Sequence, residues 1–438
     1  NRKMLGRLFI SLSLMLFSSS AYAEETAGGI NGADTGWLLI STALVMLMIP
    51  GLGLFYGGMV RRKNVLATLM GCLVGLYVVG LQWVLFGYSL AFGPDKNGLI
   101  GGLEWIGLTG VGLEPSTAYA TTVPHQAFMV FQAMFACITP GLIIGAFAER
   151  IKFSSLLIFI LLWTTLVYDP VCHWVWGSNG WLAKLGCVDF AGGLVVHLSS
   201  GMAALLACLM TGKRKGYKHQ PMSPHNLPMT ILGTGLLWFG WFGFNAGSSL
   251  SSGTLAVSAF VATNIAASAA ALTWMLIEWK HKGSPTVLGG VSGAVAGLAT
   301  ITPASGFVNP MSAVIIGIAA GIICYICVSN LKPKLGYDDS LDVFGIHGVA
   351  GICGTLAVGL FAQTAINPAG PNGFFFGNPA QLGIQALGVI VVAAYTLVIT
   401  WILLKAIDMV IGLRVSKEDE VIGLDLSQHS ECGYTIID

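Results

Sequence analysis

Long apolar segments separated by short polar loops dominate this chain. Eleven segments are apolar over enough residues to cross a hydrocarbon layer about 30 Å thick as α-helices. We predict spans at residues 36–59, 65–92, 124–148, 153–174, 189–211, 228–248, 255–279, 285–304, 310–330, 341–364 and 381–412. The pattern therefore predicts an all-α integral membrane protein.

Both ends of the chain differ from this pattern. Residues 1–23 combine a basic start, an apolar core and the small-residue cleavage site Ala21-Tyr22-Ala23, which is typical of a secretory signal peptide. An uncleaved first membrane helix is the alternative, but the apolar run of about ten residues is short for a span. We expect a signal peptide at 1–23, a transmembrane domain at 24–412 and a polar tail at 413–438.

Composition agrees with a membrane protein. Hydrophobic residues make up 55% of the chain and charged residues 9%, whereas about a quarter of the residues in a soluble domain are charged. The net charge of +1 favours neither nucleic acid nor an acidic ligand as a partner. Most of the nine cysteines lie in apolar runs, where they are expected as small packing residues, so we predict no metal and no disulfide.

Basic residues lie in alternate loops, which predicts the orientation. They occur at 61–63, 150–152, 213–218, 280–282, 332–334 and 405–417. Loops rich in Lys and Arg remain in the cytoplasm. We therefore predict an N-terminus outside and a C-terminus inside, as eleven spans require.

Two histidines lie in apolar stretches, each following an aspartate. His197 follows Asp189 in the fifth span, and His347 follows Asp342 in the tenth. A single buried histidine is more often a packed core residue, but ionisable groups at membrane depth usually mark a substrate or proton path. Matched positions predict a 5+5 inverted repeat plus one span, with both histidines in a central pore. We expect Asp342 to cap the start of the tenth span.

Five motifs resemble those of the Amt/Mep/Rh ammonium transporters, most closely the bacterial Amt branch. They are residues 53–58 (GLFYGG), 146–150 (AFAER), 189–193 (DFAGG), 240–248 (GWFGFNAGS) and 342–348 (DVFGIHG). The resemblance implies a homotrimer in the bacterial inner membrane, without a cofactor. Each subunit would carry ammonium or methylammonium through its own pore.

The resemblance also implies roles for individual residues. Trp176, Phe135 and Ser248 match the residues that recruit the ion, and Phe135 with Phe244 matches the two rings that close the pore mouth. Trp241 would line the pore beside His197 and His347. Without the motifs, Trp176 would be interpreted as an interfacial anchor and the phenylalanines as core residues.

The chemistry of these side chains suits a cation that carries N–H bonds. Aromatic faces attract any cation by about 0.5–2 kcal/mol each, and the Ser248 hydroxyl can accept an N–H bond that potassium cannot donate. Two functions remain open for Asp189. Its carboxylate could lower the energy of the recruited cation or accept its proton, or it could cap the fifth span.

The tail and the rival functions complete the prediction. Residues 423–425 and 429–431 resemble the family's C-terminal motif, which implies regulation by a P-II-type protein, although Ser430 replaces the usual glycine and puts that partner in doubt. An ammonium receptor and a channel for a neutral gas are the alternatives. We find no nucleophile or phosphate motif that would indicate an enzyme.

Overall fold

A computed structural model of the chain describes residues 29–434, so the expected signal peptide at 1–23 lies outside the described residues. Ten of the described helices are long and apolar enough to cross a membrane, and α12 (Val287–Ile301) is a shorter apolar helix among them. The chain is thus a helical membrane protein. Ten of the predicted spans correspond to these ten helices, although the fifth helix begins at Gly193 rather than Asp189. The remaining span, predicted at 285–304, corresponds to α12, which is shorter than predicted.

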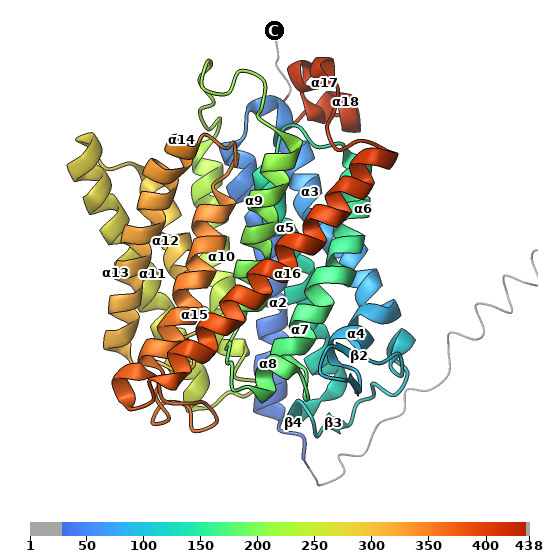
Figure 1. Ribbon diagram of the computed structural model, residues 1–438, viewed down its shortest axis with the longest axis vertical. Coiled ribbons are helices and arrows are strands. Elements are labelled where there is room, and N and C mark those ends of the chain that lie inside the picture. The colour runs from blue at the N-terminus through green and yellow to red at the C-terminus, as the bar shows by residue number, and fades with distance from the viewer. Residues whose placement is uncertain (1–28, 435–438) are drawn as a thin grey trace, which may run out of the picture.

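The helices form one bundle (Figure 1). Those of the first half are α2 (Gly32–Met59), α3 (Val65–Gln82), α4 (Tyr88–Phe92), α5 (His125–Phe147), α6 (Phe153–Trp163), α7 (Asp169–Trp176), α8 (Trp181–Lys184) and α9 (Ser199–Thr211). The remainder are α10 (Leu227–Gly247), α11 (Thr254–Lys282), α12, α13 (Pro310–Ile326), α14 (Lys332–Leu335), α15 (Val349–Phe361), α16 (Ala380–Val410), α17 (Lys417–Ile422) and α18 (Leu424–His429). Helix α16 runs obliquely across the bundle in contact with α6, α9 and α15 (Figure 1).

The two ends of the bundle differ in character. At one end, two short antiparallel hairpins pair β1 (Asp95–Lys96) with β2 (Ile100–Gly101) and β3 (Pro115–Ser116) with β4 (Ala120–Pro124). We call this the hairpin end. The other end holds α14, the loop after α9 and the tail helices α17 and α18 (Figure 1). We call it the basic end, because the Lys- and Arg-rich loops lie there.

Within residues 29–434, five π-helical turns interrupt the membrane helices. They are Trp83–Gly87, Thr164–Tyr168, Gly193–Leu198, Cys327–Leu331 and Phe344–Gly348. Four of them correspond in pairs. The turn Thr164–Tyr168 precedes Asp169-Pro170, and the turn Cys327–Leu331 precedes Lys332-Pro333. The turn Gly193–Leu198 contains His197, and the turn Phe344–Gly348 contains His347. Such turns are rare and often lie at functional sites.

Glycines allow the two histidine-bearing helices to approach closely. A β-carbon on Gly201 in α9 would overlap the backbone of Gly348, and one on Gly351 in α15 would overlap the backbone at Leu198. In a membrane, helices associate through close van der Waals packing, and small residues at the contact make this possible. The contact brings the turns that carry His197 and His347 together.

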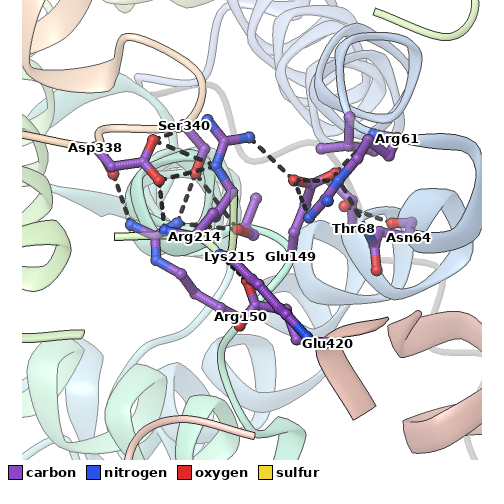
Figure 2. Close-up of polar contacts among 12 residues, drawn as sticks. Arg61, Asn64, Thr68, Glu149, Arg150, Arg214, Lys215, Asp338, Ser340 and Glu420 are labelled. Atoms are coloured by element: carbon purple, nitrogen blue, oxygen red, sulfur yellow. Dashed lines mark hydrogen bonds and ion pairs between the residues drawn. The ribbon is translucent and has the colours of Figure 1, made fainter. Parts of the chain in front are cut away.

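A buried charge cluster joins the loops at the basic end (Figure 2). Glu149 accepts hydrogen bonds from the Arg61 guanidinium, from Asn64 and from Arg214 at 3.0–3.1 Å. Arg214 also forms an ion pair with Asp338 at 2.8 Å. Burial raises the pKa of Glu149, but Arg214 and Arg61 outweigh it and hold that pKa below its ordinary value.

Arg150 and the tail extend this cluster. The Arg150 guanidinium donates to the carbonyls of Ala146, Gly212 and Asp338, and its burial lowers its pKa to about 10. Glu420 of the tail accepts from the backbone of Lys215 at 2.6 Å and from Arg414 at 2.7 Å. Glu149 and Arg150 therefore both anchor loops, and Glu149 pairs with Arg61 and Arg214 rather than with Arg150.

We predict that Glu149→Gln lowers the unfolding free energy by about 3 kcal/mol, because it removes the anion of the part-buried Arg61 and one of the two anions that pair with the buried Arg214. The folded-state pKa of Glu149 is depressed, so its contribution is present at pH 7 and is lost as pH falls through that value. The gap in melting temperature between wild type and variant should narrow below about pH 4. Glu104→Gln, which removes an exposed pair with Lys96, should leave the melting temperature unchanged. A gap independent of pH would contradict this interpretation.

Candidate functional site

His197 and His347 face each other at the centre of the bundle. Each is 2% exposed, their Nδ1 atoms are 3.2 Å apart, and their rings are nearly parallel at 18°. One Nδ1 must donate to the other in this hydrogen bond. Since a neutral imidazole has one donor and one acceptor nitrogen, the pair then offers one Nε2 acceptor and one Nε2–H donor to its surroundings. The Nε2 of His197 has no partner among the described residues.

A closed cavity lies beside this pair. His197, His347, Trp241 and Phe244 line it together with other apolar side chains from several helices. It leaves about 10 Å³ for the centre of a water-sized sphere, which is close to the minimum for one small molecule. Trp241 stacks on His197 at 5.4 Å and donates its indole N–H to Thr302, so its orientation is fixed. The cavity is narrow and almost entirely apolar apart from the two imidazoles.

Two phenyl rings separate this cavity from the hairpin end. Phe135 of α5 and Phe244 of α10 lie with their ring centroids 4.2 Å apart, and each is 1% exposed. Phe244 also lies over His197 at 6.1 Å. The rings of Phe135, Phe244, His197 and His347 thus form one continuous stack. Phe135 or Phe244 must move before a molecule can pass from the hairpin end to the histidines.

An open vestibule lies on the other side of Phe135. It has about 380 Å³ for the centre of a water-sized sphere, and Phe135, Trp176, Ser248 and Asp189 line it. Trp176 meets Phe135 edge to face at 6.0 Å. Ser248 donates its hydroxyl to the carbonyl of Phe244 at 2.8 Å, which leaves the lone pairs of its oxygen free. The three residues expected to recruit the ion are therefore at one cavity.

Asp189 is bound closely to its own backbone. Its two carboxylate oxygens accept from the N–H groups of Gly192, Gly193, Leu194 and Val195 at 2.7–3.3 Å. The backbone carbonyl of Asp189 accepts from the indole of Trp176 at 2.8 Å. Asp189 therefore caps the helix that carries His197 and positions Trp176, while its negative charge faces the vestibule. The geometry favours the capping role that the sequence left open.

The expectation that Asp342 caps the tenth span is wrong. Asp342 has a positive φ of 62° and forms an ion pair with Lys332 at 2.5 Å. Asp339 accepts instead from the backbone N–H of Phe344 at 2.8 Å, and burial raises its pKa. Asp339 lies eight residues before His347, as Asp189 lies eight before His197, and this spacing could have identified it from the sequence.

Sequence reasoning also missed three residues of the vestibule. Phe128, Gln132 and Tyr119 line it with the predicted residues. Phe128, Gln132 and Phe135 follow the i, i+4, i+7 spacing of one face of α5, so the helical period before Phe135 contained the signal for Phe128 and Gln132, while Tyr119 lies outside this helix.

Comparison with known proteins identifies the family. Residues 36–434 match the model of the Ammonium Transporter Family. The chain belongs to the ammonium transporter family. It is 52% identical over 409 residues to a putative ammonium transporter of Methanothermobacter thermautotrophicus, covering 93% of this chain and 99% of that protein. It is 50% identical over 401 residues to the ammonium transporter of Bacillus subtilis, covering 92% and 98%.

Solved structures of this family share the fold. Mep2 of Saccharomyces cerevisiae matches with a TM-score of 0.84 and 38% identity, over 89% of each chain. A structure described as a sensor Amt protein matches with a TM-score of 0.84 and 31% identity, over 91% of this chain and 98% of that one. Family members such as these are transporters or sensors of the Amt/Mep type, not enzymes.

We predict that Asp189→Asn destabilises this transporter more than Asp339→Asn does. The Asn amide has only one acceptor oxygen, so it would leave N–H groups at the start of the helix unpaired, whereas Asp339 accepts fewer of them. Thermal unfolding of the purified proteins, followed by tryptophan fluorescence, would measure the difference. Equal melting temperatures for wild type and Asp189→Asn would contradict the capping role.

Proposed function

We propose that this protein carries ammonium across the membrane by recruiting the ion, deprotonating it and conducting ammonia. The observation that supports this most is the order of the sites. An aromatic vestibule, a closed pair of phenyl rings, a nearly dry cavity and a histidine pair follow one another along one line. A cation can be held at the vestibule, but only a small neutral molecule suits the cavity.

Recruitment would occur between Trp176, Phe135 and Ser248. The two rings attract a cation by their quadrupoles, and Ser248 accepts one N–H bond. The charge of Asp189 adds negative potential below this point, even though its oxygens are hydrogen-bonded. A cation at this position remains in contact with water, so the vestibule does not impose the cost of full desolvation.

Deprotonation would occur at the phenyl rings. One N–H bond of ammonium breaks, its electron pair stays on nitrogen, and the proton leaves as ammonia enters the cavity. Ammonia can donate to the bare Nε2 and accept from the protonated Nε2 of the histidine pair, so it exchanges lost water contacts for these bonds. The released proton either returns to the vestibule or passes along the hydrogen bond between His197 and His347. Only the second route moves net charge.

The arrangement in the membrane belongs to the same proposal. We infer eleven spans in a 5+5 inverted repeat plus one, which the paired π-turns and the paired Asp–His spacing support. The basic end would face the cytoplasm of a bacterial inner membrane, with the N-terminus outside. The assembly would be a homotrimer, and the tail at residues 413–438 could receive a P-II-type protein. Multi-angle light scattering and a pull-down with such a protein test these two points.

The alternatives are less well supported. One structural relative is described as a sensor, so an ammonium receptor with the same vestibule is the second candidate. A channel for a neutral gas would not need a cation site at Trp176 and Ser248. Flux separates these functions, since a receptor binds ammonium and transports little of it.

We predict a saturable current after an ammonium concentration jump in proteoliposomes on a solid-supported membrane, and none after a potassium jump. The decay of the current should quicken as the lipid-to-protein ratio falls, because the vesicles then fill faster. A current without that dependence would indicate binding alone and favour the receptor. No current together with an ammonia flux would establish the electroneutral route.

We predict that His197→Ala combined with His347→Ala changes both the rate and the ion selectivity of uptake of labelled methylammonium. The substitutions remove the polar pair and enlarge the cavity, so water and ions gain access. His219→Ala, at an exposed loop residue, is the matched control and should behave as wild type. Unchanged rate and selectivity in the double variant would overturn the assignment of the pore.

A further inference from the structure

The vestibule must distinguish ammonium from cations of similar size. Aromatic faces attract both kinds of cation, so the rings of Phe135 and Trp176 contribute little to this choice. Ammonium differs because it donates four hydrogen bonds in tetrahedral directions, while potassium donates none. The choice therefore depends on the acceptors that the vestibule offers without a partner of their own.

Most polar groups at the vestibule are already engaged. The oxygens of Asp189 accept four backbone N–H groups. The hydroxyl of Tyr119 donates to the carbonyl of Phe92 at 2.6 Å and accepts from the backbone N–H of Ser178 at 3.3 Å. Trp176 has only a donor, which binds the carbonyl of Asp189. The Ser248 hydroxyl, by contrast, donates to the carbonyl of Phe244 and accepts no hydrogen bond, so both of its lone pairs are available.

Gln132 is the exception in the lining of the vestibule. Its Oε1 is buried and has no hydrogen-bond partner in the part of the chain that the structure describes. A buried carbonyl oxygen without a donor costs free energy, typically about 1–3 kcal/mol. A half-turn of the carboxamide exchanges its oxygen and nitrogen, so the side chain can present its oxygen to a molecule in the cavity.

The position of Gln132 suits a contact with the recruited ion. It lies one helical turn before Phe135 on the same face of α5, and both residues line the cavity that Trp176 and Ser248 also line. Phe135 and Ser248 lie on different helices, so an ion over the Phe135 ring can meet acceptors from more than one side.

We propose that Gln132 is a second N–H acceptor of the vestibule and selects ammonium over cations that lack N–H bonds. This inference rests on the proposed function and adds a selectivity residue to it. The ion would bond Ser248 Oγ and Gln132 Oε1 while it contacts the aromatic rings. Its remaining N–H groups would keep their water until the phenyl rings open.

The test is Gln132→Leu, which removes the acceptor and keeps a similar volume. The half-saturating ammonium concentration for the current on a solid-supported membrane should rise about tenfold, or ~1.4 kcal/mol. The inhibition constant of caesium, a cation without N–H bonds, should change by less than about twofold, because its contact with the rings remains. Gln132→Glu keeps an acceptor and adds charge, so it should retain high affinity for ammonium and bind caesium more tightly.

Two controls separate this effect from misfolding and from failure of the proposed function. Gln126→Leu makes the same change on the same helix outside the vestibule, where Gln126 bonds the carbonyl of Val111, and it should behave as wild type. Melting temperatures identify variants that fail to fold. If Gln132→Leu fails to fold, Gln132→Glu is used for the test instead. An equal loss of affinity for ammonium and caesium, or no loss, in folded Gln132→Leu would overturn the inference alone. A wild type with neither an ammonium current nor an ammonia flux would overturn the proposed function as well.

Discussion

The close contact between the two histidine-bearing helices is the constraint on which the centre of this protein depends. Gly201 and Gly348 meet without side chains between them, and Gly351 meets the backbone at Leu198. Larger residues at these positions would separate the helices, and the 3.2 Å hydrogen bond between the histidines would be lost. Because lipid tails are as apolar as aliphatic side chains, the membrane itself supplies little force for this association. Tight packing at glycine provides it.

The two ends of the bundle stabilise this centre in different ways. At the basic end, Glu149, Arg150 and Arg214 connect loops that are far apart in the chain. Glu420 connects the tail to the same network through the backbone of Lys215. At the hairpin end, Asp189 caps the helix of His197 and holds Trp176 through its carbonyl. The tail at the basic end and the vestibule at the hairpin end are therefore both connected to the helices that position the histidines.

The polarity of the site changes stepwise along its length. The vestibule combines rings with a few acceptors, so it can hold a cation that is still partly hydrated. The cavity beyond Phe244 is closed and has two imidazoles as its polar groups, so a charge there would lose its hydration without replacement. This difference is the physical basis of the proposed function, in which the vestibule recognises an ion and the cavity passes a neutral molecule.

Much of the fold and the site could be predicted from the sequence, because both left local signals. Apolar length determined the spans, alternate basic loops predicted an orientation, and motif matches identified Phe135, Trp176, His197, Ser248 and His347. The structure places Phe135, Trp176 and Ser248 at the vestibule, and His197 and His347 at the closed cavity.

Other features depended on partners that no local pattern reveals. Asp342 lies just before a helical turn, where a capping residue is expected, but its φ is positive and its carboxylate forms an ion pair with Lys332. Asp339 accepts the backbone N–H of Phe344 instead. The free oxygen of Gln132 is likewise a consequence of which donors lie nearby. The sequence by itself determined which segments are apolar enough to enter the membrane and which side chains are candidates for the proposed chemistry, because hydrophobic length and residue type are properties of the chain. Only the tertiary structure decided which polar groups are engaged and which remain free, because hydrogen-bond partners come from segments distant in sequence.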